Sequence, residues 1–238
     1  MTTLQNIISD IRIFMYGGMR TLPITIAGTM TILGLFTANY PMLFFLIGFL
    51  LLTPSISYII NEGCVYVINK MNWSWFNIKS TDLCKITIPY KTIDTNPNTF
   101  GPTNEPIASS TWIAMVSFFI GYIFTNGYEL YIREPESVKN ATDTSQTIEK
   151  TNNRKFRISL SMGSILLFAM ISLGYRAYTG CENGLMVFFA ILFGIFGYGW
   201  YKLLSTVGHD RLSDIFGIAN RLLVPSATTN EPTVCVPS

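Results

Sequence analysis

The stretch YPMLFFLIGFLLLTPSISYII, residues 40–60, contains no charged side chain. About 20 consecutive apolar residues in a helix cross the hydrocarbon core of a bilayer, which is about 30 Å thick. Because no water is available in that core, the backbone must satisfy its own hydrogen bonds, and a helix does so within a single segment. Residues 40–60 therefore predict a transmembrane helix.

Four further stretches share this apolar character, and they lie on both sides of the first: Leu22–Phe36, Ser110–Phe124, Phe156–Tyr175 and Leu185–Leu204. The first of them is diluted by threonine and glycine. Together with residues 40–60 they predict an all-α, polytopic transmembrane helical bundle of about five spans. A multi-pass protein of this kind contacts membrane lipids along its length.

The chain divides into three parts. Residues 1–21 predict an amphipathic helix on the membrane surface or against the bundle, because apolar residues recur at helical spacing at Leu4, Ile7, Ile8, Ile11, Phe14 and Met15. Residues 22–222 form the predicted bundle, with long loops at 61–107 and 126–155. Residues 223–238 are rich in proline and threonine and predict an extended tail.

Composition excludes several classes of protein. Charged residues make up 13% of the 238 residues and hydrophobic residues 49%, which argues against a water-soluble globule. The net charge of +2 is too small for a nucleic-acid partner. We find no glycine-rich phosphate loop and no metal-ligand spacing, and we expect no cofactor and no metal.

The glycines of the fifth span and the four cysteines each predict a structural feature. Gly194, Gly197 and Gly199 lie close together and would let a neighbouring helix approach tightly. Among the four cysteines, Cys64 and Cys84 could form a disulfide if their side of the membrane is oxidising, while free buried thiols are the other interpretation.

If the chain crosses the membrane five times, the connections between spans alternate between its two sides. We define the first face as the N-terminal residues with connections 61–107 and 176–184, and the second face as connection 126–155 with the residues after the fifth span. The first face carries seven lysines and arginines, and the second carries nine when Arg157 and Lys202, near the ends of the fourth and fifth spans, are counted with it. The positive-inside rule therefore favours a cytoplasmic second face.

The segment YRAYTGCEN, residues 175–183, followed by an apolar helix with glycines, resembles the third signature of the type 2 phosphatidic acid phosphatases, membrane relatives of the vanadium haloperoxidases. That signature is Ser-Arg, five residues, His, three residues, Asp. Arg176 matches its arginine. Glu182 stands at the position of the nucleophilic histidine, and Met186 stands at the position of the aspartate that orients it.

The other two signatures are matched less closely. ASST, residues 108–111, is similar to the second signature, Pro-Ser-Gly-His: Ser109 fits, while Thr111 replaces the histidine that protonates the leaving group. The first signature, Lys, six residues, Arg-Pro, would fall after the second span, where Val65 takes the lysine position. The three segments follow the family's order and share the first face, so the resemblance implies a degenerate phosphatase-type bundle over residues 40–204.

The resemblance also implies what this chain has lost. In the family a histidine attacks phosphorus and forms a phosphohistidine, while basic groups hold the phosphate. An ionised Glu182 would repel phosphate, so we expect Glu182 to pair with Arg176 and to neutralise the former anion site. The single histidine, His209, follows the last span on the opposite face, where a solvated or capping role is expected.

These observations predict a non-catalytic, phosphatase-like membrane protein, a pseudoenzyme with remnant positions Ser109, Thr111, Arg176 and Glu182. We expect a structural role that links the membrane to other membrane or capsid proteins. The favoured setting is a viral internal or host-derived membrane under a capsid, as for a minor capsid component of a large DNA virus. A subunit of an organellar complex, a divergent lipid phosphatase or phosphotransferase, and a lipid-binding protein without turnover are the alternatives.

Overall fold

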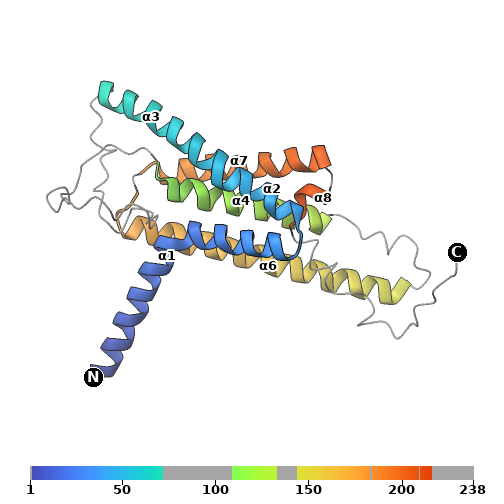
Figure 1. Ribbon diagram of the computed structural model, residues 1–238. Helices are drawn as coiled ribbons and strands as arrows, with labels where there is room; N and C mark the ends of the chain where they lie inside the picture. The colour runs from blue at the N-terminus through green and yellow to red at the C-terminus, as the bar shows by residue number, and fades with distance from the viewer. Residues whose placement is uncertain (1, 72–108, 133–143, 183, 209, 216–238) are drawn as a thin grey trace.

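The computed structural model describes residues 2–71, 109–132, 144–182, 184–208 and 210–215. Within these ranges all regular structure is helical (Figure 1). The elements are α1 (Thr2–Phe36), α2 (Tyr40–Ile47), the π-helical η1 (Gly48–Leu52), α3 (Thr53–Met71), α4 (Thr111–Ile132), α6 (Thr144–Tyr178), α7 (Met186–Gly208) and the short α8 (Asp210–Ser213).

Five helical segments are long and apolar enough to cross a membrane, and they are Gly17–Phe36, Tyr40–Val67, Thr111–Ile132, Lys155–Tyr178 and Met186–Gly208. Each contains the core of one stretch predicted from the sequence. The chain is therefore an all-α helical bundle with the make-up of a multi-pass membrane protein, as the sequence predicts.

The third candidate span, in α4, is the centre of the bundle and the most buried of the five. In Figure 1 the green α4 lies between α7 on one side and α1 and α6 on the other, and it contacts all three as well as α3. The aromatic rings of Phe45, Phe49, Phe118 and Tyr122 pack together where η1 and α2 meet α4. The span in α6 is the least buried.

Glycines set the distance between α4 and α7. A Cβ atom at Gly197 would lie 2.2 Å from the backbone oxygen of Phe118, and one at Gly121 would lie 2.1 Å from that of Gly194. The predicted close approach is confirmed at Gly194 and Gly197. Gly199 faces open space instead, so it has no part in this contact.

The far end of α4 is fixed by polar groups around α8. Tyr122 Oη donates to the backbone oxygen of Ser213 at 2.9 Å, and Asn126 Nδ2 donates to the same oxygen at 3.2 Å and to Asp214 Oδ1 at 3.3 Å. An ion pair between Lys202 and Glu129 joins α7 to α4 nearby. These contacts close the bundle at the end opposite to the predicted remnant site (Figure 1).

The helices extend further than the sequence predicts. The predicted boundary at residues 21 and 22 falls inside the continuous α1, and residues 61–71 of the predicted loop 61–107 belong to α3. Residues 126–132 and 144–155 of the predicted loop 126–155 belong to α4 and α6. A polar helical turn that leaves the membrane has no apolar period, so hydropathy alone ends each helix too early. The predicted tail, 223–238, lies outside the described residues.

Candidate functional site

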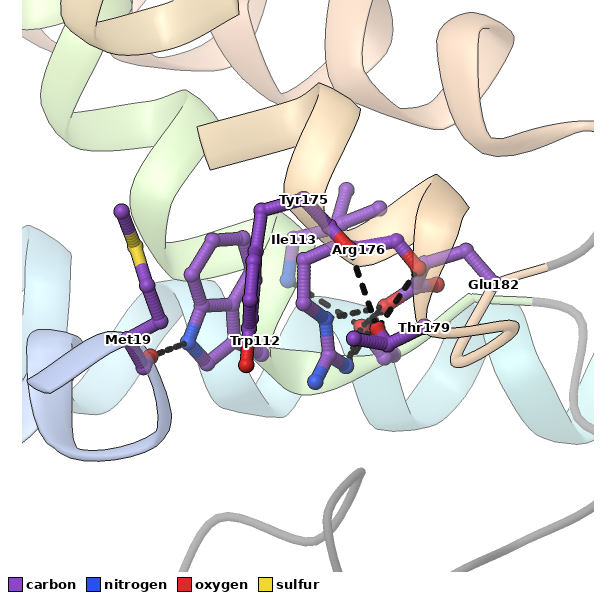
Figure 2. Close-up of polar contacts among 8 residues, drawn as sticks. Met19, Trp112, Ile113, Tyr175, Arg176, Thr179 and Glu182 are labelled. Atoms are coloured by element: carbon purple, nitrogen blue, oxygen red, sulfur yellow. Dashed lines mark hydrogen bonds and ion pairs between the residues drawn. The ribbon is translucent and has the colours of Figure 1, made fainter. Parts of the chain in front are cut away.

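The candidate site lies where α4 begins and α6 ends, in the turn that leads to α7. Figure 2 shows Arg176 and Glu182 with their side chains directed toward one another and toward the start of α4. Two of the segments that resemble phosphatase signatures therefore meet at one end of the bundle through their described residues, 109–111 and 175–182, as the sequence predicts.

The turn after α6 is a Schellman motif, which ends a helix by folding the chain back over its last turn. Gly180 adopts a φ of 67°, a left-handed conformation that favours glycine. Its N–H donates to the Ala177 oxygen at 3.1 Å, and the Cys181 N–H donates to the Arg176 oxygen at 3.2 Å. This geometry returns the chain toward Arg176 and brings Glu182 alongside it.

Ser110 caps the first turn of α4. Its Oγ accepts a hydrogen bond from the N–H of Ile113 at 3.2 Å, which satisfies one of the donors that a helix start leaves free. The same hydroxyl donates its proton to Glu182 Oε1 at 2.5 Å. One serine therefore joins the start of α4 to the turn after α6.

Arg176 and Glu182 form a buried ion pair, which confirms the predicted pairing. Arg176 donates from Nη2 to Glu182 Oε1 at 2.6 Å and from Nε to the same oxygen at 3.1 Å. The side chains are only 3% and 2% exposed. Arg176 Nη2 also lies 3.4 Å from Ser110 Oγ. Glu182 Oε1 thus accepts three hydrogen bonds, two from Arg176 and one from Ser110.

Trp112 holds the other side of Arg176. The guanidinium carbon lies 4.8 Å from the centre of the indole ring, within range of a cation–π interaction. The indole Nε1 donates to the backbone oxygen of Met19 at 2.7 Å. That oxygen needs a donor because Pro23, four residues later in α1, has no N–H to offer. Trp112 therefore links α1 to the ion pair.

Opposing electrostatic effects act on the Glu182 carboxyl. Burial raises the pKa of the Glu182 carboxyl above its usual range, while the Arg176 guanidinium and the Ser110 hydroxyl act in the opposite direction. A buried carboxylate is tolerated when an opposite charge and hydrogen bonds compensate its desolvation. Those groups are arranged around Glu182 here, so the charge of Arg176 is met from within the chain.

The remaining predicted residues take no part in the contacts of the Arg176–Glu182 pair given above. Ser109 is buried, and within the described residues its Oγ has no hydrogen-bond partner. Thr111 is exposed at the first position of α4. Met186 begins α7 and packs against the apolar cluster around Trp112 and Phe189. Val65, at the lysine position of the first signature, lies in α3, while His209 and residues 72 and 73, at the Arg-Pro positions, lie outside the described residues.

Two cysteines of the first face differ in state. Cys64 carries a free thiol, so of the two interpretations the free thiol holds at Cys64 and the Cys64–Cys84 disulfide does not form, whereas the free-thiol interpretation is wrong for Cys181. Cys181 is disulfide-bonded and buried, and its partner sulfur lies outside the described residues. Along the chain Cys181 stands directly before Glu182, in the Schellman turn.

Among the residues discussed above, the site holds the guanidinium of Arg176, the carboxyl of Glu182 and the hydroxyls of Ser109, Ser110 and Thr111. Within the described residues no group of three or more histidines, cysteines, aspartates or glutamates could hold a metal ion. Sequence reasoning missed Trp112, although Pro23 was a signal, because a proline inside a helix leaves a carbonyl that a neighbouring donor can satisfy. Comparison of the chain with protein-family models, with curated proteins and with solved structures found no match.

Proposed function

We propose that this chain is a non-catalytic, multi-pass membrane protein that acts as a structural component of a membrane-bound assembly. The buried Arg176–Glu182 pair carries the proposal. The resemblance assigns Arg176 to phosphate binding, but its Nε and Nη2 atoms are already engaged by a carboxylate of the same chain. The turn that supplies this carboxylate is itself fixed by backbone hydrogen bonds.

A phosphate would have to displace Glu182 from Arg176. Displacement would leave a buried carboxylate beside a second anion, and two like charges in a poorly solvated site repel strongly. The residues at positions 111, 182 and 186 are threonine, glutamate and methionine, where the family has two histidines and an aspartate. Since such groups act as a unit, their joint absence removes essentially all turnover.

The proposed setting is a viral internal or host-derived membrane under a capsid, where membrane and capsid proteins are the partners. Support comes from the shape of α1, whose N-terminal part points away from the bundle in Figure 1. Such an arm offers a partner a surface that packing within the bundle does not use. A subunit of an organellar membrane complex is the same proposal in a second setting.

A divergent lipid phosphatase or phosphotransferase is the competing function, and one observation favours it. Ser109 Oγ is buried beside the capping Ser110, and no group in the described part of the chain forms a hydrogen bond with it. An unsatisfied buried hydroxyl is uncommon in a site that serves packing alone. Lipid binding without turnover would use the same hydroxyl.

Phosphate release from phosphatidic acid and from lipid pyrophosphates by the purified chain in detergent separates these functions. Arg176→Ala is the test variant, and Arg157→Ala, an exposed arginine of the same helix, is the matched control. The proposal predicts no release by folded wild-type protein above a protein-free blank. Release that Arg176→Ala abolishes and Arg157→Ala retains would contradict it.

The structural role has its own test. Membranes from the natural source are solubilised in a mild detergent, and the chain is followed by sedimentation and by cross-linking with mass spectrometry. We expect the chain to sediment with a defined set of proteins and to cross-link to them. A chain that sediments alone with lipid would contradict a structural role in an assembly.

A further inference from the structure

The disulfide at Cys181 indicates which side of the membrane is oxidising, and this inference does not depend on the proposed function. Cys181 is 3% exposed and lies in the Schellman turn, between Gly180 and Glu182. The chain has four cysteines, and Cys64 is a free thiol. The partner of Cys181 is therefore Cys84 or Cys235.

The order of the helices distinguishes these two cysteines. Cys84 belongs to the connection that leaves α3 and enters α4, and Ser110, directly before the first residue of α4, donates a hydrogen bond to Glu182. Cys235 follows α7, whose 23 residues at about 1.5 Å each carry the chain about 35 Å away from the turn. At that far end, α8 and Ser213 contact Tyr122 and Asn126.

A disulfide requires its two Cα atoms to lie within about 7 Å of one another. Residues 216–238 contain no apolar stretch that could recross a bilayer as a helix, and a lipid-exposed extended chain does not cross one. We propose that Cys181 pairs with Cys84 and that the first face, with the Arg176–Glu182 pair, lies in an oxidising, non-cytoplasmic compartment.

Two independent arguments agree on this orientation. Disulfides form and persist in oxidising compartments and are rare in the cytosol. With Arg157 and Lys202 at the span ends included, the second face carries nine lysines and arginines against seven on the first, which favours a cytoplasmic second face. The disulfide also ties connection 61–107 to the turn that supplies Glu182, so the ion pair is covalently fixed to a second segment.

Counting thiols tests the pairing without requiring the variants to fold. Membranes are prepared with an alkylating agent present, and free thiols are counted in denaturant by mass spectrometry. A Cys84–Cys181 bond predicts two free thiols in the wild type, three in Cys84→Ser and one in Cys235→Ser, because the chain has four cysteines. A Cys181–Cys235 bond reverses the two variant values, and four thiols in the wild type mean no disulfide. Either result overturns the pairing.

Protease protection tests the orientation. Trypsin is added to sealed vesicles whose cytosolic side faces outward, and the fragments are mapped. We expect cleavage in connection 126–155, at Lys139, Lys150 or Arg154, and none in connection 61–107 until detergent opens the vesicles. Cleavage at Lys79, Lys85 or Lys91 in sealed vesicles would place the first face in the cytosol and overturn the orientation.

Discussion

Arg176 is a cation that four separate groups hold in place at the end of a membrane-type bundle. Glu182 supplies the charge, Ser110 supplies a hydroxyl and Trp112 supplies an aromatic face, while the turn at Gly180 fixes the distance between the two charged residues. Removing one partner of a buried pair leaves the other uncompensated, which costs far more than the pair contributes when it is intact.

Part of this site was predictable from residues alone. The pair was predicted from charge, because a glutamate at the position of the nucleophilic histidine would repel phosphate and can neutralise Arg176. The turn at Gly180 that brings the two residues together is known from the structure. Trp112 and Ser110 were not predictable as its neighbours, because their contact with Arg176 depends on how α4 docks against α6. No local pattern encodes that docking.

The link between Trp112 and Met19 leads to the first prediction. Trp112→Phe keeps an aromatic face beside Arg176 but removes the donor to the Met19 oxygen, and we expect the free energy of unfolding to fall by about 1–2 kcal/mol. In a Pro23→Ala background the introduced alanine offers its own N–H to that oxygen, so the same change should cost less than half as much. Denaturant titrations of the four proteins in detergent measure both values. Equal losses in the two backgrounds would mean that the Met19 oxygen does not depend on Trp112.

Among the helices, α4 and α7 approach closely because glycines, which have no Cβ atom, lie at their contact. Gly121 and Gly197 let the two backbones approach, since a Cβ atom at either would meet a backbone oxygen of the opposite helix. Association of helices in lipid relies on such close packing, because lipid tails are as apolar as the side chains.

Gly197→Ala is therefore expected to destabilise the bundle by about 1–3 kcal/mol, because α7 must move away from Phe118. Gly199→Ala, two residues later in the same helix, is the matched control, since nothing lies within 4 Å of its added methyl group. We expect the control to be neutral or slightly stabilising. Thermal unfolding in detergent compares the two, and equal losses would show that helix propensity rather than close packing decides the effect.

Helix positions were predictable from the sequence, whereas helix ends were not. The apolar stretches located all five spans, because hydropathy reports what a bilayer can accept. The end of α3 and the start of α6 extend into polar sequence, where hydrogen bonding within the helix continues after the apolar pattern stops. Gly197 and Gly199 look alike in sequence, and only the packing of α4 separates them.

At the scale of the whole molecule, apolar side chains lie on the outside of most helices, including Leu160, Leu166 and Ile171 on α6. This surface is stable in lipid and costly in water. We therefore expect the chain to stay in the membrane pellet after alkaline carbonate extraction and to dissolve only in detergent. A chain released by carbonate would be attached to the membrane surface rather than inserted in it.

The buried ion pair implies that Glu182, and not a ligand, neutralises Arg176. A double-mutant cycle of Arg176→Gln and Glu182→Gln, with unfolding followed in detergent, tests it most directly. We predict that each single change lowers the free energy of unfolding by about 3–5 kcal/mol and that the double change costs less than either one. Additive losses, or an Arg176→Gln protein as stable as the wild type, would contradict the claim.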